Sequence, residues 1–128
     1  MARADTPEDV SRLLGEAISS RDMEGALSFY EPGATFAMPH GFGEGSVTGL
    51  DDLRGALGGF LAMDPDLKIN PEKSLLSGET ALVIGNWTLK GTGPDGSAVD
   101  ASGRYADVVR RQPDGSWLFV IDNPNGSD

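Results

Sequence analysis

The chain has 128 residues, with 38% hydrophobic and 23% charged side chains, a balance typical of one globular domain, which we expect to span residues 1–128. Its net charge of −10 repels phosphate groups, so neither nucleic acid nor an anionic membrane surface is an expected partner. The absence of cysteine excludes disulfides and thiolate chemistry, and no apolar run or signal-like start points to a membrane or to export, so we expect a cytoplasmic protein.

Three helices are predicted in the first half of the chain. Thr6 and Pro7 form a helix start signal, and apolar residues then recur from Val10 to Ile18 with the spacing of one helix face. A short second helix is expected after Asp22, which can cap it, and Pro32-Gly33 is expected to end it. The third is predicted to run from about Gly49 to Asp64, where a proline follows.

The strands are predicted mainly in the second half. A short strand, Ala34 to Met38, and a glycine-rich loop, Gly41 to Gly45, precede the third helix. The segment from Leu67 to Leu76 contains Pro71, which favours an edge strand or a bulge, and a long strand follows from Thr80 to Lys90. Helices that come before an antiparallel meander indicate an α+β fold, a cone-shaped curved mixed or antiparallel sheet wrapped around about three N-terminal helices.

The last third of the chain is predicted to be a β-hairpin, in which two β-rich runs flank the turn Pro113-Asp114-Gly115. If the turn centres on its first two residues, Tyr105 lies opposite Asp122 and Asp107 opposite Val120. Side chains alternate between faces, so all four would share one face, with the two aspartates as diagonal neighbours roughly 7–8 Å apart. A slip of one residue in register would break this arrangement.

The two aspartates stand among apolar residues, where a carboxylate costs free energy unless it is paired, hydrogen-bonded or protonated. One interpretation is an acid–base pair, with Asp107 kept neutral by a raised pKa and Asp122 as the proton acceptor. The alternative is a structural pair, satisfied by backbone amides or by Arg104, Arg110 or Arg111.

Three stretches of the chain resemble the nuclear transport factor 2-like (NTF2-like) superfamily, in its SnoaL-like and ketosteroid-isomerase-like branch. They cover residues 29–36, 81–87 and 103–124, and the chain looks most similar to the small SgcJ/EcaC-type proteins. The resemblance extends over roughly the whole chain and implies the cone fold. It says less about activity, because this fold is used by isomerases, cyclases, hydrolases and non-catalytic association domains.

The resemblance assigns only part of a known catalytic set to this chain. In ketosteroid isomerases the general-base aspartate matches Met38 here, the first-helix tyrosine matches Leu14, and the neutral aspartate matches Asp107. Two of the three groups are therefore replaced, and steroid-type isomerisation by that set is not expected. By the same resemblance, Asp122 lies where last-strand acids act in related cyclases and epoxide hydrolases.

The candidate site residues fall into two groups. Candidate catalytic residues are Asp107, Asp122, Tyr105 and His40, although a lone loop histidine is more often simply solvated. Candidate ligand-binding residues share a large apolar side chain and are equally suited to an ordinary core; they are Tyr30, Phe36, Met38, Phe60 and Trp87. No residues are spaced as metal ligands, and the glycines from 91 to 96 join two strands without a helix, so neither a metal nor another cofactor is expected.

Two functions are compatible with these residues. The first is an enzyme that isomerises, cyclises or hydrates a hydrophobic small molecule. The second is a non-catalytic ligand-binding or association domain. A homodimer is expected through the outer sheet face, because Val108, Trp117, Phe119 and Ile121 would form an exposed apolar patch there.

Overall fold

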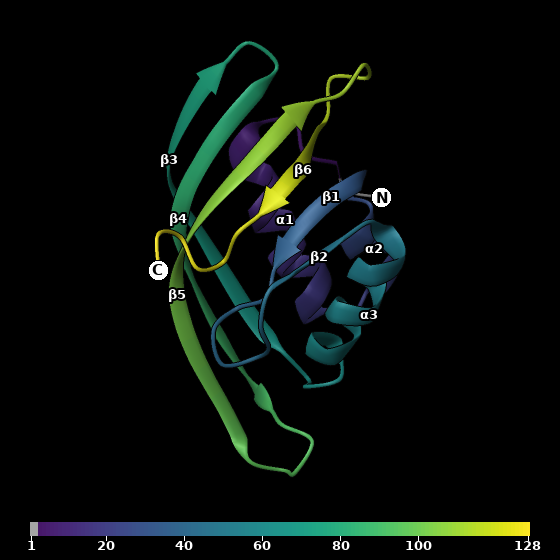
Figure 1. Ribbon diagram of the computed structural model, residues 1–128, viewed down its shortest axis with the longest axis vertical. Helices are drawn as coiled ribbons and strands as arrows, with labels where there is room; N and C mark the ends of the chain where they lie inside the picture. Colours follow the sequence, from purple (N-terminus) through teal and green to yellow (C-terminus); the bar gives the residue numbers. More distant parts are fainter. Residues whose placement is uncertain (1–2) are drawn as a thin grey trace.

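The structure, a computed structural model, describes residues 3–128, which form three helices and six strands (Figure 1). The helices are α1 (Pro7–Ser19), α2 (Met23–Leu27) and α3 (Leu50–Leu61), and the strands are β1 (Tyr30–Ala37), β2 (Ser46–Thr48), β3 (Asp66–Ser77), β4 (Thr80–Thr92), β5 (Ala98–Arg111) and β6 (Trp117–Asp122). One sheet contains all six strands in the order β2-β1-β6-β5-β4-β3. The β1–β6 pair is parallel and the other pairs are antiparallel, so the predicted α+β class with a mixed sheet is confirmed.

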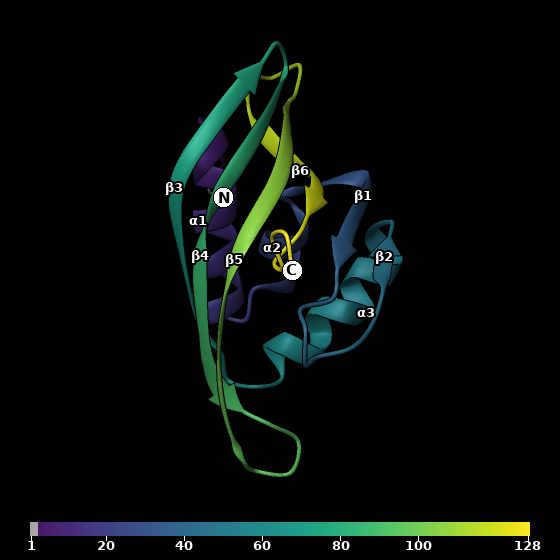
Figure 2. The same cartoon turned by 60° about the vertical axis from the view of Figure 1, so that its left-hand side comes forward.

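The helices lie on the concave side of the curved, unclosed sheet, as Figure 2 shows. Helix α1 packs against β3 to β6, α3 against β1 and β2, and α2 lies against the other two helices. Apolar residues at every third or fourth position make these contacts, namely Val10, Leu14 and Ile18 on α1 and Leu53, Leu57 and Phe60 on α3. Within residues 3–128, no helix combines the length and apolarity that crossing a membrane requires.

Local signals in the sequence account for several element boundaries. Pro7 opens α1, and the Asp22 side chain accepts a hydrogen bond from the backbone N–H of Gly25, which caps α2. Strand β3 is at the sheet edge, and its pairing with β4 shifts register between Pro71 and Lys73. Both features match the edge or bulge that Pro71 predicts, since proline has no N–H for the ladder.

Two strand predictions need correction. Strand β1 begins at Tyr30, four residues before the predicted start, and Pro32-Gly33 lies inside it rather than ending a helix. Its pairing with β6 is interrupted between Tyr30 and Thr35, and this interruption accommodates the residue without an N–H. The short strand β2 was not predicted; it pairs with the end of β1 through Thr35↔Thr48.

The hairpin register differs from the predicted one. Arg111 pairs with Trp117 and Val109 with Phe119, one residue away from the expected alignment. The ladder then changes to Val108↔Ile121, which leaves Val120 without a partner as a β-bulge. The bulge shifts β6 by one residue, so that Phe119 and Asp122 both point inward although they are three residues apart.

The register also corrects the composition of the outer face. Trp117 and Phe119 were expected there, but they are core residues that are 6% and 0% exposed. Val108 does lie on the outer face, because its neighbours Asp107 and Val109 are both buried, and its pairing partner Ile121, which precedes the buried Asp122, lies there too. The apolar surface predicted to form a dimer interface is therefore built from a different set of side chains.

Candidate active site

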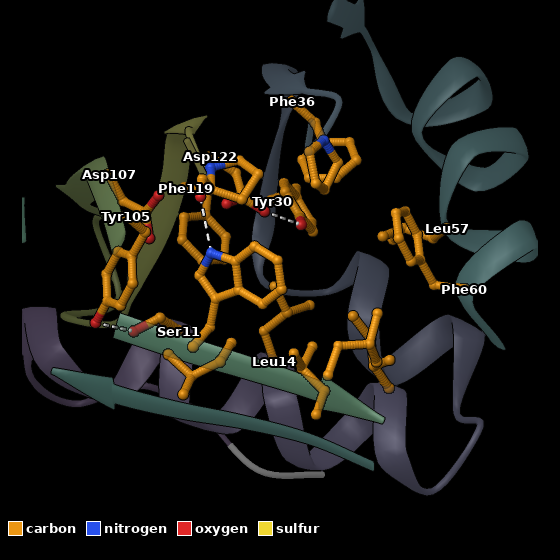
Figure 3. Close-up of a pocket in the computed structure, with 17 residues that line it drawn as sticks. Ser11, Leu14, Tyr30, Phe36, Leu57, Phe60, Tyr105, Asp107, Phe119 and Asp122 are labelled. Atoms are coloured by element: carbon orange, nitrogen blue, oxygen red, sulfur yellow. Dashed lines mark hydrogen bonds between the residues drawn. The ribbon is translucent and has the colours of Figure 1, made fainter. Parts of the chain in front are cut away.

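A cavity of about 70 Å³ lies between the sheet and the helices (Figure 3). One end is apolar and is formed by Phe36 of β1 with Leu57 and Phe60 of α3. The other end carries Asp107 and Asp122. Further lining residues from all the surrounding elements are Ser11, Leu14, Ile18, Tyr30, Pro39, Leu67, Ile69, Trp87, Leu89, Tyr105, Phe119 and Pro124.

Asp107 and Asp122 lie directly opposite each other on neighbouring strands. Val108 pairs with Ile121, and the N–H of Ala106 donates to the carbonyl of Asn123, so the two aspartates are enclosed between these links. They are therefore closer than the predicted diagonal neighbours. Only 2% of Asp107 and 7% of Asp122 is exposed, which means that neither carboxyl group is compensated by bulk water.

Each carboxyl group has a dedicated hydrogen-bond donor. The backbone N–H of Asn123 donates to Oδ1 of Asp107 at 2.8 Å, and the Tyr30 hydroxyl donates to Oδ2 of Asp122 at 2.6 Å. The two carboxyl groups also affect each other, because a proton on Asp107 that points toward Asp122 raises the pKa of Asp107 and lowers that of Asp122. A hydroxyl donor does hold Asp122, but it is Tyr30 from β1 and not Tyr105, which the predicted register had placed opposite.

The surroundings separate the proton affinities of the two aspartates. Burial raises the pKa of Asp107 well above its ordinary value, and the nearby charge of Asp122 raises it further against the opposing bond from Asn123. Burial also raises the pKa of Asp122, but the bonds from Tyr30 and Asp107 oppose it and leave that pKa at about 6. Asp107 is therefore the carboxyl group that holds a proton more tightly, and Asp122 is the one that ionises more readily.

The arginines that could have neutralised this pair all bind other carboxylates. The guanidinium nitrogen to carboxylate oxygen distances are 3.0 Å from Arg104 to Glu72, 2.9 Å from Arg110 to Glu31 and 2.6 Å from Arg111 to Glu79. The arginine form of the structural interpretation is therefore wrong. The backbone amide of Asn123 is the part of that interpretation that the structure contains.

Tyr105 occupies the wall beside Asp107, where glycine leaves room for its ring. Its hydroxyl lies 3.0 Å from Oγ of the buried Ser11 on α1, and burial raises the pKa of Tyr105 to about 12. Gly85 pairs with Tyr105 across the β4–β5 ladder, and a Cβ there would lie 2.6 Å from the Tyr105 ring. A side chain at this position would therefore push the ring out of the wall.

Trp87 connects the cavity to the segment that follows β6. Its ring lies over Gly103, where a Cβ would approach to 2.9 Å, and its indole N–H donates to the carbonyl of Pro124 at 2.7 Å. The next residue, Asn125, donates from Nδ2 to the carbonyl of Met38 at 3.0 Å. The chain after β6 thus holds one side of the cavity against the end of β1.

Two predicted site residues do not line the cavity. Met38 follows the end of β1 and its side chain lies against Gly43, while the preceding Phe36 points inward. His40 is exposed, and its backbone N–H donates to Oδ1 of Asn125. The other predicted site residues, namely Asp107, Asp122, Tyr105, Tyr30, Phe36, Phe60 and Trp87, all line it. Across residues 3–128, no group of three or more histidine, aspartate or glutamate side chains is arranged to hold a metal.

The sequence did not indicate that Tyr30 bonds to Asp122. The two residues are 92 positions apart, and their contact depends on the parallel pairing of β1 with β6. Ser11 and Pro124 were also missed. Ser11 carried a weak signal, since a serine beside Val10 falls on the buried stripe of α1.

Solved structures with this fold come from several bacteria. A ketosteroid isomerase-like protein from Erwinia carotovora atroseptica aligns with a TM-score of 0.77 and 17% identity over 90% of this chain and 88% of that one. A candidate calcium/calmodulin-dependent protein kinase II association domain from Xanthomonas campestris aligns with a TM-score of 0.75 and 20% identity over 96% of this chain and 92% of that one. A candidate dehydratase of the NTF2-like family from Streptomyces avermitilis aligns with a TM-score of 0.72 and 18% identity over 88% of each chain. At these identities the likeness defines the NTF2-like fold and no activity.

The sequence itself matches the SnoaL-like domain family over residues 10–120. The chain therefore belongs to the SnoaL-like family, and its fold is that of the NTF2-like proteins. No curated protein matches it in sequence.

Proposed function

We propose that this SnoaL-like protein is an acid–base enzyme that isomerises, cyclises or hydrates a small hydrophobic molecule. The observation that carries the proposal is the buried pair of Asp107 and Asp122 at one end of an otherwise apolar cavity. Burying two carboxyl groups costs free energy, and among the described residues the groups that offset this cost are the neutral donors Tyr30 and Asn123 rather than an arginine.

The two carboxyl groups have complementary roles at neutral pH. Asp107, whose pKa is raised well above its ordinary value, would donate a hydrogen bond to a ligand oxygen in its protonated form, and Asp122, with a pKa of about 6, can accept a proton from an adjacent carbon or from water. Tyr30 holds Asp122 in place through the 2.6 Å bond. Isomerisation, cyclisation and hydration each need one proton removed and one supplied, so the pair suits all three classes.

A small ketone tests this proposal without knowledge of the natural substrate. The exchange of the α-hydrogens of 2-butanone with D2O, followed by proton NMR, measures proton removal beside a carbonyl. We expect the protein to accelerate exchange, with a rate that rises through about pH 6 as Asp122 ionises. Asp122→Asn should lower the rate by about a hundredfold or more.

Two variants complete this experiment. Asp107→Asn keeps a hydrogen-bond donor and should lose less than Asp122→Asn. The control is Asp100→Asn, which changes an exposed carboxylate on the same strand and should leave the rate unchanged. Exchange at the rate of buffer alone, or equal rates for Asp122→Asn and Asp100→Asn, would contradict the enzymatic proposal.

A second candidate function is association through the outer face of the sheet. Four apolar residues lie in one row across four strands there, paired as Leu75↔Leu82↔Val108↔Ile121. Leu75 is 53% and Ile121 41% exposed, and such a row in water favours burial against a partner. We propose a second copy of this chain as that partner. The likeness to a candidate association domain supports this reading.

A further inference from the structure

The cavity beside the aspartates is small for the molecule it is proposed to bind. Its volume of about 70 Å³ compares with roughly 300–1,000 Å³ for typical ligand pockets. Only a small fragment fits it as it stands. A larger ligand must therefore extend into a neighbouring space.

One such space is lined by Phe42, whose ring contacts Phe60 of the cavity. It is an open groove of about 510 Å³ between the Gly41–Gly45 loop and the end of the β4–β5 hairpin, lined by Phe42, Met63, Pro94 and Val99 among others. Together the cavity and the groove reach the volume of an ordinary ligand site.

Phe42 is the side chain of the groove that contacts a residue of the inner cavity. It lines the groove, and its ring centroid lies 5.4 Å from that of Phe60, which lines the inner cavity. Its neighbours Gly41 and Gly43 have φ values of 89° and 151°, which glycine adopts at little cost. The base of the loop is fixed by the bond from the Met38 N–H to the Gly45 carbonyl at 3.0 Å, so a movement of Phe42 need not disturb β1.

The charges around both spaces restrict the ligand. No lysine, arginine or histidine is among the described residues that line the cavity or the groove, whereas Asp107, Asp122 and Asp95 are. An anionic ligand would meet these carboxyl groups and the net charge of −10. The apolar side chains of Met63, Pro94 and Val99 instead suit an aliphatic or aromatic tail.

We propose that the groove formed by Phe42, Met63, Pro94 and Val99 is the second half of the ligand site. It binds the apolar tail of an elongated, uncharged molecule whose oxygen lies at Asp107 and Asp122, and Phe42 moves aside to join the two halves. This inference rests on the proposed function, because it takes the carboxyl end of the cavity as the place where the reacting oxygen binds.

A series of straight-chain 2-ketones, from 2-butanone to 2-decanone, tests the inference by isothermal titration calorimetry. We expect Kd to fall about three- to fourfold for each added methylene once the chain reaches the groove. Octanoate, which has a similar tail and a negative charge, should bind more weakly than 2-octanone. Equal affinities along the ketone series, or tighter binding of octanoate, would overturn the inference, and the series needs no variant that could fail to fold.

Two variants locate the tail. Val99→Asp should raise the Kd of 2-decanone about tenfold or more and leave that of 2-butanone unchanged. Its control is Ala98→Asp, which places the same charge on the adjacent residue of β5, exposed on the opposite face. Phe42→Ala should speed the association of 2-decanone, followed by tryptophan fluorescence from Trp87. Equal effects of Val99→Asp and Ala98→Asp on 2-decanone, or unchanged association in Phe42→Ala, would overturn the inference.

The outcomes separate this inference from the proposed function. If 2-butanone exchanges its α-hydrogens in an Asp122-dependent way while chain length has no effect on Kd, the tail site is wrong and the acid–base function stands. If the longer ketones bind in the groove but no exchange occurs, the tail site stands and the enzymatic proposal is wrong. If no ketone binds at all, both are overturned for this ligand class.

Discussion

Two adjacent rows of the sheet reverse the usual distribution of polar and apolar residues. The inner row holds Val83 paired with Asp107, which lies opposite Asp122, all of them buried. The outer row, one residue along each strand, holds Leu82, Val108 and Ile121. Carboxyl groups thus face the core while aliphatic side chains face out, and both arrangements cost free energy in an isolated chain. This difference suggests that each face is completed by something else, a ligand inside and a second copy outside.

The largest effect is expected on the outer row. Ile121→Asp would place a charge in the middle of the proposed dimer interface, and twice per dimer by symmetry, so we expect the dimer dissociation constant to rise about a hundredfold or more. Light scattering at tens of micromolar protein measures it. The control is Leu76→Asp, because Leu76 is 63% exposed but pairs with the buried Ala81 and so faces the other side. A wild-type monomer at that concentration would refute the dimer.

The two aspartates of the inner row should make the free energy of unfolding depend on pH. The folded state raises the pKa of Asp122 from 3.8 to about 6, so it binds this proton more tightly than the unfolded state does. The stabilisation is complete below pH 3.8 and is lost as the pH rises through about 6.

A variant that cannot titrate at these positions provides the reference. Relative to the double variant Asp107→Asn with Asp122→Asn, wild type should lose at least about 3 kcal/mol of unfolding free energy between pH 3 and pH 8, because Asp122 alone contributes that much at about 1.4 kcal/mol per pH unit and the raised pKa of Asp107 adds to the loss. Urea unfolding at a series of pH values measures this difference. A difference independent of pH would mean that the pair titrates as it does in water.

A smaller effect is expected from removing one hydroxyl group. Tyr30→Phe deletes the bond that lowers the pKa of Asp122, so that pKa should rise above 6 by about one unit. The pH profile of α-hydrogen exchange should shift upward by the same amount. Ser11→Ala is the matched control, since it removes a buried hydroxyl bonded to Tyr105 rather than to either aspartate. An unchanged profile in Tyr30→Phe would show that Tyr30 does not control Asp122.

The smallest effect is expected from Asp107→Asn. An asparagine can accept the bond from the Asn123 N–H through its oxygen and donate to Asp122 through its nitrogen, as protonated Asp107 does. We therefore expect the free energy of unfolding at pH 7 to change by less than about 1 kcal/mol. Thermal unfolding measures this, and a large loss of stability would indicate that Asp107 is ionised in the native protein.

The sequence predicted the fold well because its signals are local. Helix spacing, the Asp22 cap, the Pro71 edge strand and the order of elements all depend on neighbours within a few residues. The site was predicted less completely because its register is not local. Neither glycine nor proline marks the bulge at Val120, so the faces of Trp117 and Phe119 were assigned wrongly.

Two errors offset each other at Asp122. Near the turn the observed register differs from the predicted one by one residue, and the unforeseen bulge adds a second residue in the same direction, so Asp122 returns to the inward face and lies directly opposite Asp107. The partner of Asp122 could not be derived in this way. Tyr30 meets it only because β1 pairs in parallel with a strand at the far end of the chain, a contact that no local pattern encodes.

The most direct test of the acid–base pair is an NMR titration of the side-chain carboxyl carbons of Asp107 and Asp122, assigned with the two single asparagine variants. Our account predicts that Asp122 titrates near pH 6 and that Asp107 stays protonated to a higher pH. Two ordinary titrations near pH 4 would contradict it, because both carboxylates would then be ionised at neutral pH and neither could act as the proton donor.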